Sequence, residues 1–267
     1  MDKIYTLVTG SSSGIGKEIA LYCASLGMNI LHVALPDTGL KDINDTLIDR
    51  YNINSDYLEV DLSELDGPEK VFDWVTEKKY KVNFLVNNAG MAGTCVFEES
   101  TLKYLDDRIL VNMRALVLLT RLFIPLLKKN HKSYILNVGS LSAFYSIPYK
   151  SLYAASKAFV VNISKALKSE LKQTGILISV VCPNGVRTNP GTNYRIDAHG
   201  MKGRLTSVSS REVARLSVDK TLKGKFLIIP GKINYLLYLT SKIIPYWIQE
   251  KILLKEFQKE VKVSRNE

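Results

Sequence analysis

The sequence predicts a single α/β domain built on a parallel sheet of about seven strands, with helices on both faces. Short apolar, β-rich runs alternate with amphipathic stretches along most of the 267 residues. The runs are apolar almost throughout, as in strands that helices cover on both faces. Glycine-rich or polar motifs follow several runs at their carboxyl ends, where ligands bind in a doubly wound sheet. Together these patterns predict a doubly wound fold.

Seven runs are expected to form the strands. They are Ile4–Thr9, Asn29–Ala34, Asp56–Val60, Asn83–Val86, Ser133–Val138, Ile176–Val181 and Lys225–Ile229. The stretches between them have helical spacing, for example Ile15–Leu26 and Leu40–Tyr51. Residues 1–230 are therefore expected to hold the sheet, and residues 231–267 to form an apolar and basic helical extension of the same domain.

Composition is that of an ordinary soluble protein, with 46% hydrophobic and 23% charged residues. The window Ile19–Pro36 is uncharged and long enough to cross a bilayer, but Gly27 and Asn29 divide it into a helix end and a strand. Because strand-like sequence begins at Ile4, no secretory signal is expected. The cysteines Cys23, Cys95 and Cys182 show neither disulfide nor metal spacing, so the prediction is a cytoplasmic protein without a metal.

A glycine-rich turn, Thr9-Gly-Ser-Ser-Ser-Gly-Ile-Gly16, follows the first strand and opens the first helix. Gly10 permits a tight turn, Gly14 lets the backbone approach a pyrophosphate, and Gly16 allows close packing of helix on strand. The free N–H groups at the start of the helix favour an anion. The turn therefore predicts a dinucleotide site, although a plain strand–helix turn also uses glycine.

Two further motifs stand at strand ends. Asp61 follows the third strand and is placed to accept a hydrogen bond from an adenine amino group, unless it only stabilises a turn. The motif Asn87-Asn88-Ala89-Gly90 ends the fourth strand, where it can brace the sheet and line a ribose, or simply form a turn. After the second strand stands Leu35-Pro36-Asp37, with no basic residue to meet a 2′-phosphate. The cofactor is therefore NAD(H) or NADP(H), and the sequence favours NAD(H).

Tyr153 and Lys157 are four positions apart, so on a helix they share one face. An ammonium beside a phenol favours the phenolate and lowers the pKa of the tyrosine, which makes Tyr153 a candidate proton donor to a carbonyl. Ser140 ends the fifth strand and can hold a substrate carbonyl beside the tyrosine. Asn112 lies within a predicted helix, although asparagine has a low helix propensity.

The ordered set of these motifs, together with Pro183-Asn-Gly-Val-Arg-Thr188, resembles the short-chain dehydrogenase/reductase family from residue 4 to about 230. The resemblance implies a Rossmann-type fold and a catalytic tetrad of Asn112, Ser140, Tyr153 and Lys157. In it Tyr153 protonates the substrate oxygen as hydride leaves the nicotinamide, Lys157 binds the nicotinamide ribose, Ser140 polarises the carbonyl, and Asn112 anchors a water of the proton relay.

The resemblance also implies the residues that contact the cofactor. They are Gly10, Ser12, Ser13, Gly14, Ile15, Gly16, Asp61, Leu62, Asn88, Ala89, Gly90, Tyr153, Lys157, Pro183, Val186 and Thr188. One departure is visible, because Asn184 stands where the family usually has glycine after proline. Since asparagine tolerates left-handed backbone, we expect an altered loop rather than lost binding.

The carboxyl-terminal part is expected to select the substrate. Residues 189–210 lack periodicity and are predicted to form a loop over the site. The segment Thr221–Glu267 contains nine Lys/Arg and four Asp/Glu. Its excess positive charge is therefore about half of the net charge of +10. The apolar segment Ile233–Leu254 resembles the end of a reductase subgroup that acts on lipid-like or steroid-like ketones. It either rests on a bilayer or packs on the domain, at a substrate entrance or an oligomer contact.

The sequence thus predicts a reductase or dehydrogenase of an apolar ketone or secondary alcohol, such as a 3-keto lipid, a ketoacyl compound or a steroid-like ketone. We expect a homo-oligomer, a dimer or tetramer. The alternative is a catalytically silent nucleotide-binding regulator or scaffold of the same fold. The basic charge by itself does not indicate nucleic-acid binding, because the sequence carries no motif of that kind.

Overall fold

The computed structural model describes residues 3–188 and 190–264. Its main sheet has seven strands in the order β3-β2-β1-β4-β5-β6-β9, and every neighbouring pair is parallel. The strands are β1 (Ile4–Thr9), β2 (Asn29–Ala34), β3 (Ser55–Glu59), β4 (Lys81–Asn87), β5 (Ser133–Val138), β6 (Ile176–Val181) and β9 (Leu227–Ile228). The predicted doubly wound sheet is confirmed.

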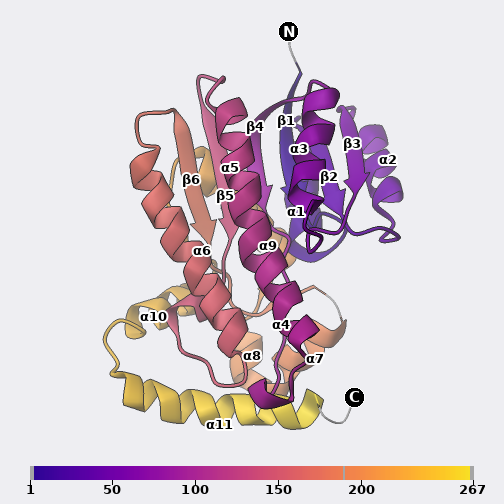
Figure 1. The fold of residues 1–267 in the computed structure, drawn as a ribbon. Helices are drawn as coiled ribbons and strands as arrows, with labels where there is room; N and C mark the ends of the chain where they lie inside the picture. Colours follow the sequence, from indigo (N-terminus) through magenta and orange to yellow (C-terminus); the bar gives the residue numbers. More distant parts are fainter. Residues whose placement is uncertain (1–2, 189, 265–267) are drawn as a thin grey trace.

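Helices link the strands and cover both faces of the sheet (Figure 1). They are α1 (Gly14–Ser25), α2 (Leu40–Tyr51), α3 (Gly67–Glu77), α4 (Leu102–Ile109), a π-helical segment (Leu110–Ala115), α5 (Leu116–Leu127), α6 (Ser151–Glu170) and α9 (Ser210–Leu222), with short 3₁₀ turns at Phe97–Glu99 and Leu141–Phe144. Four strands have the predicted bounds. β3 begins and ends one residue earlier than expected, and β9 keeps only the middle of its predicted run.

The core lies in two layers, one on each face of the sheet. Alternate strand residues such as Val8 and Ile30 meet Ile19 and Cys23 of α1 and Val213 of α9. The other alternate strand residues pack on the opposite face against α3 and α5. The strand residues are Leu7, Leu31, Leu85 and Ile135, and the helix residues are Val71 and Val75 of α3 and Leu119 and Phe123 of α5. Each such large apolar side chain contributes roughly 1.5–3 kcal/mol by leaving water, which fixes the register of the strands.

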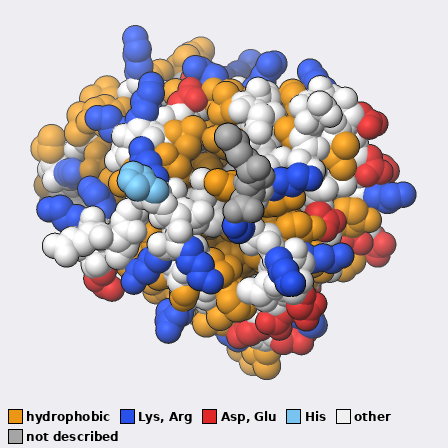
Figure 2. Space-filling view, turned by 90° about the horizontal axis from the view of Figure 1, so that it is seen from above, with side chains coloured by type: hydrophobic (Ala, Val, Ile, Leu, Met, Phe, Trp, Pro, Cys, Tyr) orange, Lys and Arg blue, Asp and Glu red, His pale blue; other side chains and the backbone are white. Residues whose placement is uncertain are grey.

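The carboxyl ends of the strands share one end of the sheet, and the later part of the chain gathers there (Figure 1). It contains α7 (Pro190–Ala198), α8 (Gly200–Thr206), α10 (Lys232–Thr240) and α11 (Tyr246–Ser264), with the short parallel pair β7 (Val186–Arg187) and β8 (Val208–Ser209). The division at residue 230 falls between β9 and α10 and stays a prediction. Figure 2 shows the opposite end of the molecule, where Lys and Arg side chains are scattered around apolar patches and acidic ones gather toward one edge.

Residues 190–210 are not the loop that the sequence predicts. They form α7, α8 and β8, and Asn189 lies outside the described residues. Each helix is too short to display an amphipathic period, so periodicity could not reveal them. They are held instead by tertiary contacts, including pairing of Val186 with Val208 and packing of α11 on α7.

One helical stretch, Leu102–Leu127, is long and apolar enough to cross a bilayer, and a third of its apolar window is buried. Its buried side packs on β4 and α3 and carries Asn112 into the sheet's carboxyl end, which is how a core helix is used. The window Ile19–Pro36 is divided as expected, because Gly27 takes a left-handed φ of 77° between α1 and β2.

Candidate active site

The turn after β1 has no room for a side chain at its three glycines, Gly10, Gly14 and Gly16. Gly10 and Gly14 have positive φ values of 63° and 55°, which disfavour any other residue. A Cβ on Gly16 would lie 2.2 Å from the Gly10 carbonyl oxygen, so a side chain there would push α1 off the turn. The bare backbone at the start of α1 fits a pyrophosphate, as the motif predicts.

The Asn-Asn-Ala-Gly motif braces this turn. Asn88 Nδ2 donates to the carbonyl oxygens of Thr9 and Gly10 at 2.9 and 3.0 Å. The hydroxyl of Thr9 accepts from the N–H groups of Asn88 and Ala89. Buried Asn87 donates to Asn137 and Thr120, which ties β4 to β5 and α5. These amides shape the site, and contact of Asn88 and Ala89 with a cofactor stays a prediction.

Asp61 lies two residues beyond the end of β3. Its Oδ1 accepts from the N–H and the hydroxyl of Ser63 at 2.8 and 2.7 Å, which is the turn role left open by the sequence. The following Leu62 is buried in the core against the sheet. A role of Asp61 and Leu62 in holding adenine stays a prediction.

The segment from Pro183 to Thr188 closes over the glycine turn. A Cβ on Gly14 would lie 3.0 Å from Thr188 Cγ2, so the two segments face each other across a narrow gap. The Pro183 carbonyl oxygen accepts from Leu141 N, which joins this segment to the end of β5. Val186 is buried in β7. A flat ring bound between the two segments fits the predicted roles of Pro183, Val186 and Thr188.

Asn184 does not adopt the left-handed backbone that asparagine tolerates. Its Nδ2 donates instead to Asn234 Oδ1 of α10 at 3.2 Å. Asn234 is 1% exposed and donates to the Thr206 and Pro230 carbonyls. The departure from the family pattern therefore links the cofactor loop to the carboxyl-terminal helices.

Asn112, Lys157 and Gly90 meet at one point. A methyl group on Gly90 would lie 3.3 Å from both Asn112 Oδ1 and Lys157 Nζ, so only glycine leaves this space open. Asn112 stands in the π-helical segment, a feature often found at functional sites. Both ends of its amide are used, since Oδ1 accepts from Met91 N and Nδ2 donates to Met91 O and Ser156 Oγ.

Tyr153 and Lys157 lie on one face of α6, as their spacing predicts. Lys157 Nζ is 5.9 Å from the centroid of the Tyr153 ring and donates to the Val138 carbonyl at 2.8 Å. Burial lowers the pKa of Lys157 to about 8. Ser140 follows β5, and its hydroxyl accepts from Ser142 N. All four predicted catalytic residues therefore stand at the carboxyl end of the sheet.

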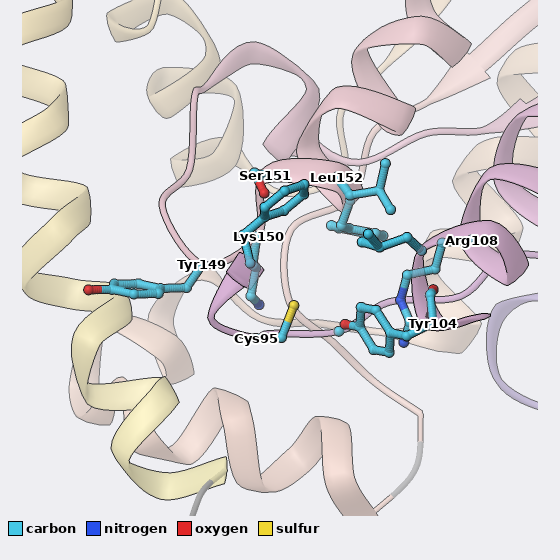
Figure 3. A pocket seen from close by; sticks show the side chains of 11 residues that line it. Cys95, Tyr104, Arg108, Tyr149, Lys150, Ser151 and Leu152 are labelled. Atoms are coloured by element: carbon cyan, nitrogen blue, oxygen red, sulfur yellow. Dashed lines mark hydrogen bonds between the residues drawn. The ribbon is translucent and has the colours of Figure 1, made fainter. Parts of the chain in front are cut away.

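A crevice of about 10 Å³ opens beside Tyr153 and has room for about one water (Figure 3). Tyr104 and Arg108 of α4 border it on one side, and Lys150, Ser151 and Leu152 at the start of α6 on the other. The Arg108 guanidinium lies 3.2 Å from the centroid of the Tyr104 ring. It also donates to the Ala92 carbonyl and so holds the loop after β4.

A buried polar cluster, here called the Glu260 cluster (Thr94, Lys150, His199, Glu256 and Glu260), joins α11 to the walls of the site. Glu260 has a fully buried side chain. Lys150 Nζ lies 2.8 Å from it, Thr94 Oγ1 donates at 2.6 Å, and His199 Nε2 lies at 3.2 Å. His199 Nδ1 lies 3.0 Å from Glu256.

The charges of the Glu260 cluster stabilise one another. Burial opposes ionisation of Glu260, but His199, Lys150 and Thr94 outweigh it and lower its pKa to about 2. The hydrogen bond to Glu260 raises the pKa of His199. A buried carboxylate without such partners would cost several kcal/mol. One side chain of α11 thus links two segments that line the crevice to the junction of α7 and α8.

Sequence reasoning missed Arg108 and the whole Glu260 cluster. The only available signal was the spacing of Glu256 and Glu260 with Leu253 and Phe257, which places acids on the packed face of a lysine-rich helix. No pattern in the sequence indicated which distant cations these acids would meet.

The model of the short-chain dehydrogenase family matches residues 5–198. The chain belongs to this family. It is an oxidoreductase that uses a nicotinamide cofactor and acts on CH–OH or C=O groups. The use of a nicotinamide cofactor agrees with the glycine turn. The action on CH–OH or C=O groups agrees with the grouping of Asn112, Ser140, Tyr153 and Lys157.

Three curated relatives illustrate the range. The chain is 33% identical to a short chain dehydrogenase of Pseudocercospora fijiensis over 80% of this chain and 72% of that protein. It is 31% identical to the very-long-chain 3-oxoacyl-CoA reductase of Rattus norvegicus over 69% of this chain, and it spans only 60% of that reductase. It is 26% identical to the 3-oxoacyl-[acyl-carrier-protein] reductase of Buchnera aphidicola over 73% of this chain and 79% of that protein.

Solved structures share the fold. A short-chain dehydrogenase from Sphingobium yanoikuyae in complex with NADPH has a TM-score of 0.77 and 26% identity, covering 91% of this chain and 94% of that one. A short-chain dehydrogenase/reductase from Burkholderia phymatum in complex with NAD has a TM-score of 0.79 and 23% identity, covering 89% and 92%.

Proposed function

We propose that the protein interconverts a long-chain or otherwise apolar ketone and its secondary alcohol, with a 3-keto lipid or ketoacyl compound as the favoured class. The observation that carries the chemistry is the meeting of Lys157 and Asn112 at Gly90, one helical turn from Tyr153. Two of the curated relatives are 3-oxoacyl reductases, which supports the substrate class.

In the reducing direction a nicotinamide cofactor, which the glycine turn and Lys157 would hold, would supply hydride to the carbonyl carbon. Tyr153 gives its phenolic proton to the carbonyl oxygen. The C=O double bond thereby becomes a C–O single bond, with a new C–H bond at the carbon and a new O–H bond at the oxygen. The Lys157 cation stabilises the phenolate that remains. Ser140 orients the carbonyl oxygen, and Asn112 fixes the loop at Met91 against α6. The same groups serve the oxidation, in which Tyr153 accepts the proton.

We propose NAD(H) as the preferred cofactor. Two exposed residues just past β2, Leu35 and Asp37, offer no positive charge to a 2′-phosphate, and Asp37 takes a left-handed φ of 59° in the turn before α2. A carboxylate at this place repels the extra phosphate of NADP(H).

We further propose a cytoplasmic homo-oligomer with peripheral membrane contact through residues 231–260. Figure 1 shows α5 and α6 side by side on one face of the molecule. Apolar side chains of the helical stretch Leu102–Leu127 are only partly buried there, which suits self-association.

The decisive test is the variant Tyr153→Phe, assayed with NADH and NADPH and a series of ketones from short and polar to long and apolar. We expect turnover to fall at least about 10²-fold while NADH binding, followed by fluorescence titration, is unchanged. Full activity of Tyr153→Phe would show that another group donates the proton. Binding of neither nucleotide by the unaltered protein would contradict the enzyme proposal and favour a scaffold.

A further inference from the structure

The outer side of α10 and α11 carries large apolar side chains that contact water. They are Tyr235, Leu236, Ile243, Tyr246, Trp247 and Ile252, exposed by 53 to 79%. This set is here called the α10–α11 face. Figure 1 shows α11 lying across the end of the molecule, beyond the carboxyl ends of the strands. An exposed apolar set of this size is unusual in a soluble monomer and marks an interaction surface.

The exposed charges around this face are mostly positive, with five lysines and one acid. Between Lys232 and Lys259 the exposed lysines are Lys232, Lys242, Lys251, Lys255 and Lys259, and the exposed acid is Glu250. The other two acids of α11, Glu256 and Glu260, turn inward. There they pair with His199 and Lys150. Glu256 also lies within ion-pair distance of exposed Lys202 and Lys259, so within the described part of the chain the uncompensated lysines of the face are the other four. The Glu260 cluster therefore removes negative charge from the outer side and leaves it basic.

The aromatic residues of the face are suited to a polar–apolar boundary. Tyr and Trp have an apolar body and a polar edge, and they concentrate where membranes meet water. Lys251 Nζ lies 5.7 Å from the Trp247 ring centroid, so a cation lies beside the exposed indole of α11. Lysines among Trp, Tyr and aliphatic residues on helices are typical of interfacial binding.

We infer that the α10–α11 face docks on an anionic lipid bilayer. A second copy of this chain is the less favourable occupant, because two such faces would bring their lysines together. The inference deepens the proposed function. The purpose of docking rests on that function, because an apolar ketone dissolves in a bilayer. Its evidence is the surface alone. The same helix that would touch lipid borders the site through Glu260, so docking would place the substrate entrance near its source.

The test uses the full-length variant Trp74→Phe, which leaves Trp247 as the sole tryptophan of the two. It is titrated with vesicles of phosphatidylcholine, with and without phosphatidylglycerol, and no substrate is present. With the anionic vesicles we expect a blue shift of the emission, quenching by brominated lipid, and loss of both in high salt.

Two charge-reversal variants locate the contact. Lys251→Glu with Lys255→Glu should weaken binding about 30-fold or more, since each lysine near an anionic surface changes affinity roughly fivefold. The matched control, Lys128→Glu with Lys129→Glu, changes the net charge equally just beyond the end of α5. It should leave binding within about twofold.

The inference is overturned if Trp247 shows no shift, if neutral and anionic vesicles bind alike, or if the control weakens binding as much. It is also overturned if the Lys251/Lys255 variant changes the oligomeric state in sedimentation, because the face would then be a contact between copies. Vesicle binding by a protein without activity would contradict only the proposed enzyme function. Activity without vesicle binding would contradict only this inference.

Discussion

Lys157 illustrates how a single residue is placed for chemistry at the expense of stability. Its ammonium is buried, and among residues 3–188 and 190–264 its one hydrogen-bond acceptor is the Val138 carbonyl at 2.8 Å. Burial without a carboxylate lowers its pKa from 10.5 to about 8. A group whose pKa falls on folding weakens the fold at any pH where the unfolded chain would hold the proton.

We therefore expect Lys157→Met to abolish turnover yet stabilise the protein free of cofactor. The lowered pKa corresponds to a penalty of about 3 kcal/mol, from which the lost hydrogen bond subtracts about 1 kcal/mol. The gain is full below pH 8 and disappears as the pH rises toward 10.5, the ordinary lysine value. Urea unfolding at several pH values measures it, and a variant less stable than the unaltered protein at pH 7 would contradict this account.

At the scale of elements, α11 acts on the site from a distance. Through the Glu260 cluster it holds the loop after β4 at Thr94, the start of α6 at Lys150 and the junction of α7 and α8 at His199. The first two of these segments line the crevice beside Tyr153, whereas the glycine turn is braced independently by Asn88.

We expect Glu260→Gln to raise KM for an apolar ketone several-fold and to leave NADH affinity unchanged. The substitution keeps the shape of the side chain but removes the charge of Glu260 from Lys150 and leaves Glu256 as the carboxylate beside His199, a loss of about 2–4 kcal/mol in the free energy of unfolding. Steady-state kinetics and thermal unfolding measure the two effects. Glu250→Gln, an exposed acid on the same helix, is the control and should change neither. Weakened NADH binding with an unchanged KM would show that α11 supports the cofactor half instead.

Elements differ in how far the sequence predicts them. β1, β2, β5 and β6 match their expected bounds, because continuous apolar runs between turns have no other stable place than a covered sheet. The shared face of Tyr153 and Lys157 was predictable because residues four apart on a helix are neighbours, whereas Asn112 and Ser140 were named through the family resemblance. α7 and α8 were not, since they are short and depend on β7–β8 pairing and on α11. The partners of Glu260 lie up to 166 positions away, and no local pattern encodes such a contact.

At the scale of the whole molecule, the outer side of α6 faces solvent and is available for contact with a second copy of the chain. α6 offers exposed Ala155 midway between Tyr153 and Lys157, while the residues that reach the core, Ala154 and Ser156, stand beside it. A small residue at this place allows another helix to approach closely.

We expect Ala155→Glu to convert a dimer or tetramer into smaller species without unfolding the monomer, because a charge in a helix–helix contact is costly while the same charge in water is not. Light scattering after size exclusion measures the mass, and circular dichroism checks the fold. Gln173→Glu, which adds the same charge at an exposed turn, should leave the mass unchanged. An unchanged mass for Ala155→Glu would place the contact elsewhere or show a monomer.

The Glu260 cluster has a consequence for the order in which the protein matures on the ribosome. Its carboxylate is made 61 positions after His199, when all seven strands and the whole tetrad have already been synthesised. A nascent chain ending near residue 230 therefore holds a complete glycine turn, but Lys150 and His199 still lack their shared partner. The growing protein would acquire nucleotide binding first and discrimination among substrates later, when α11 emerges and docks.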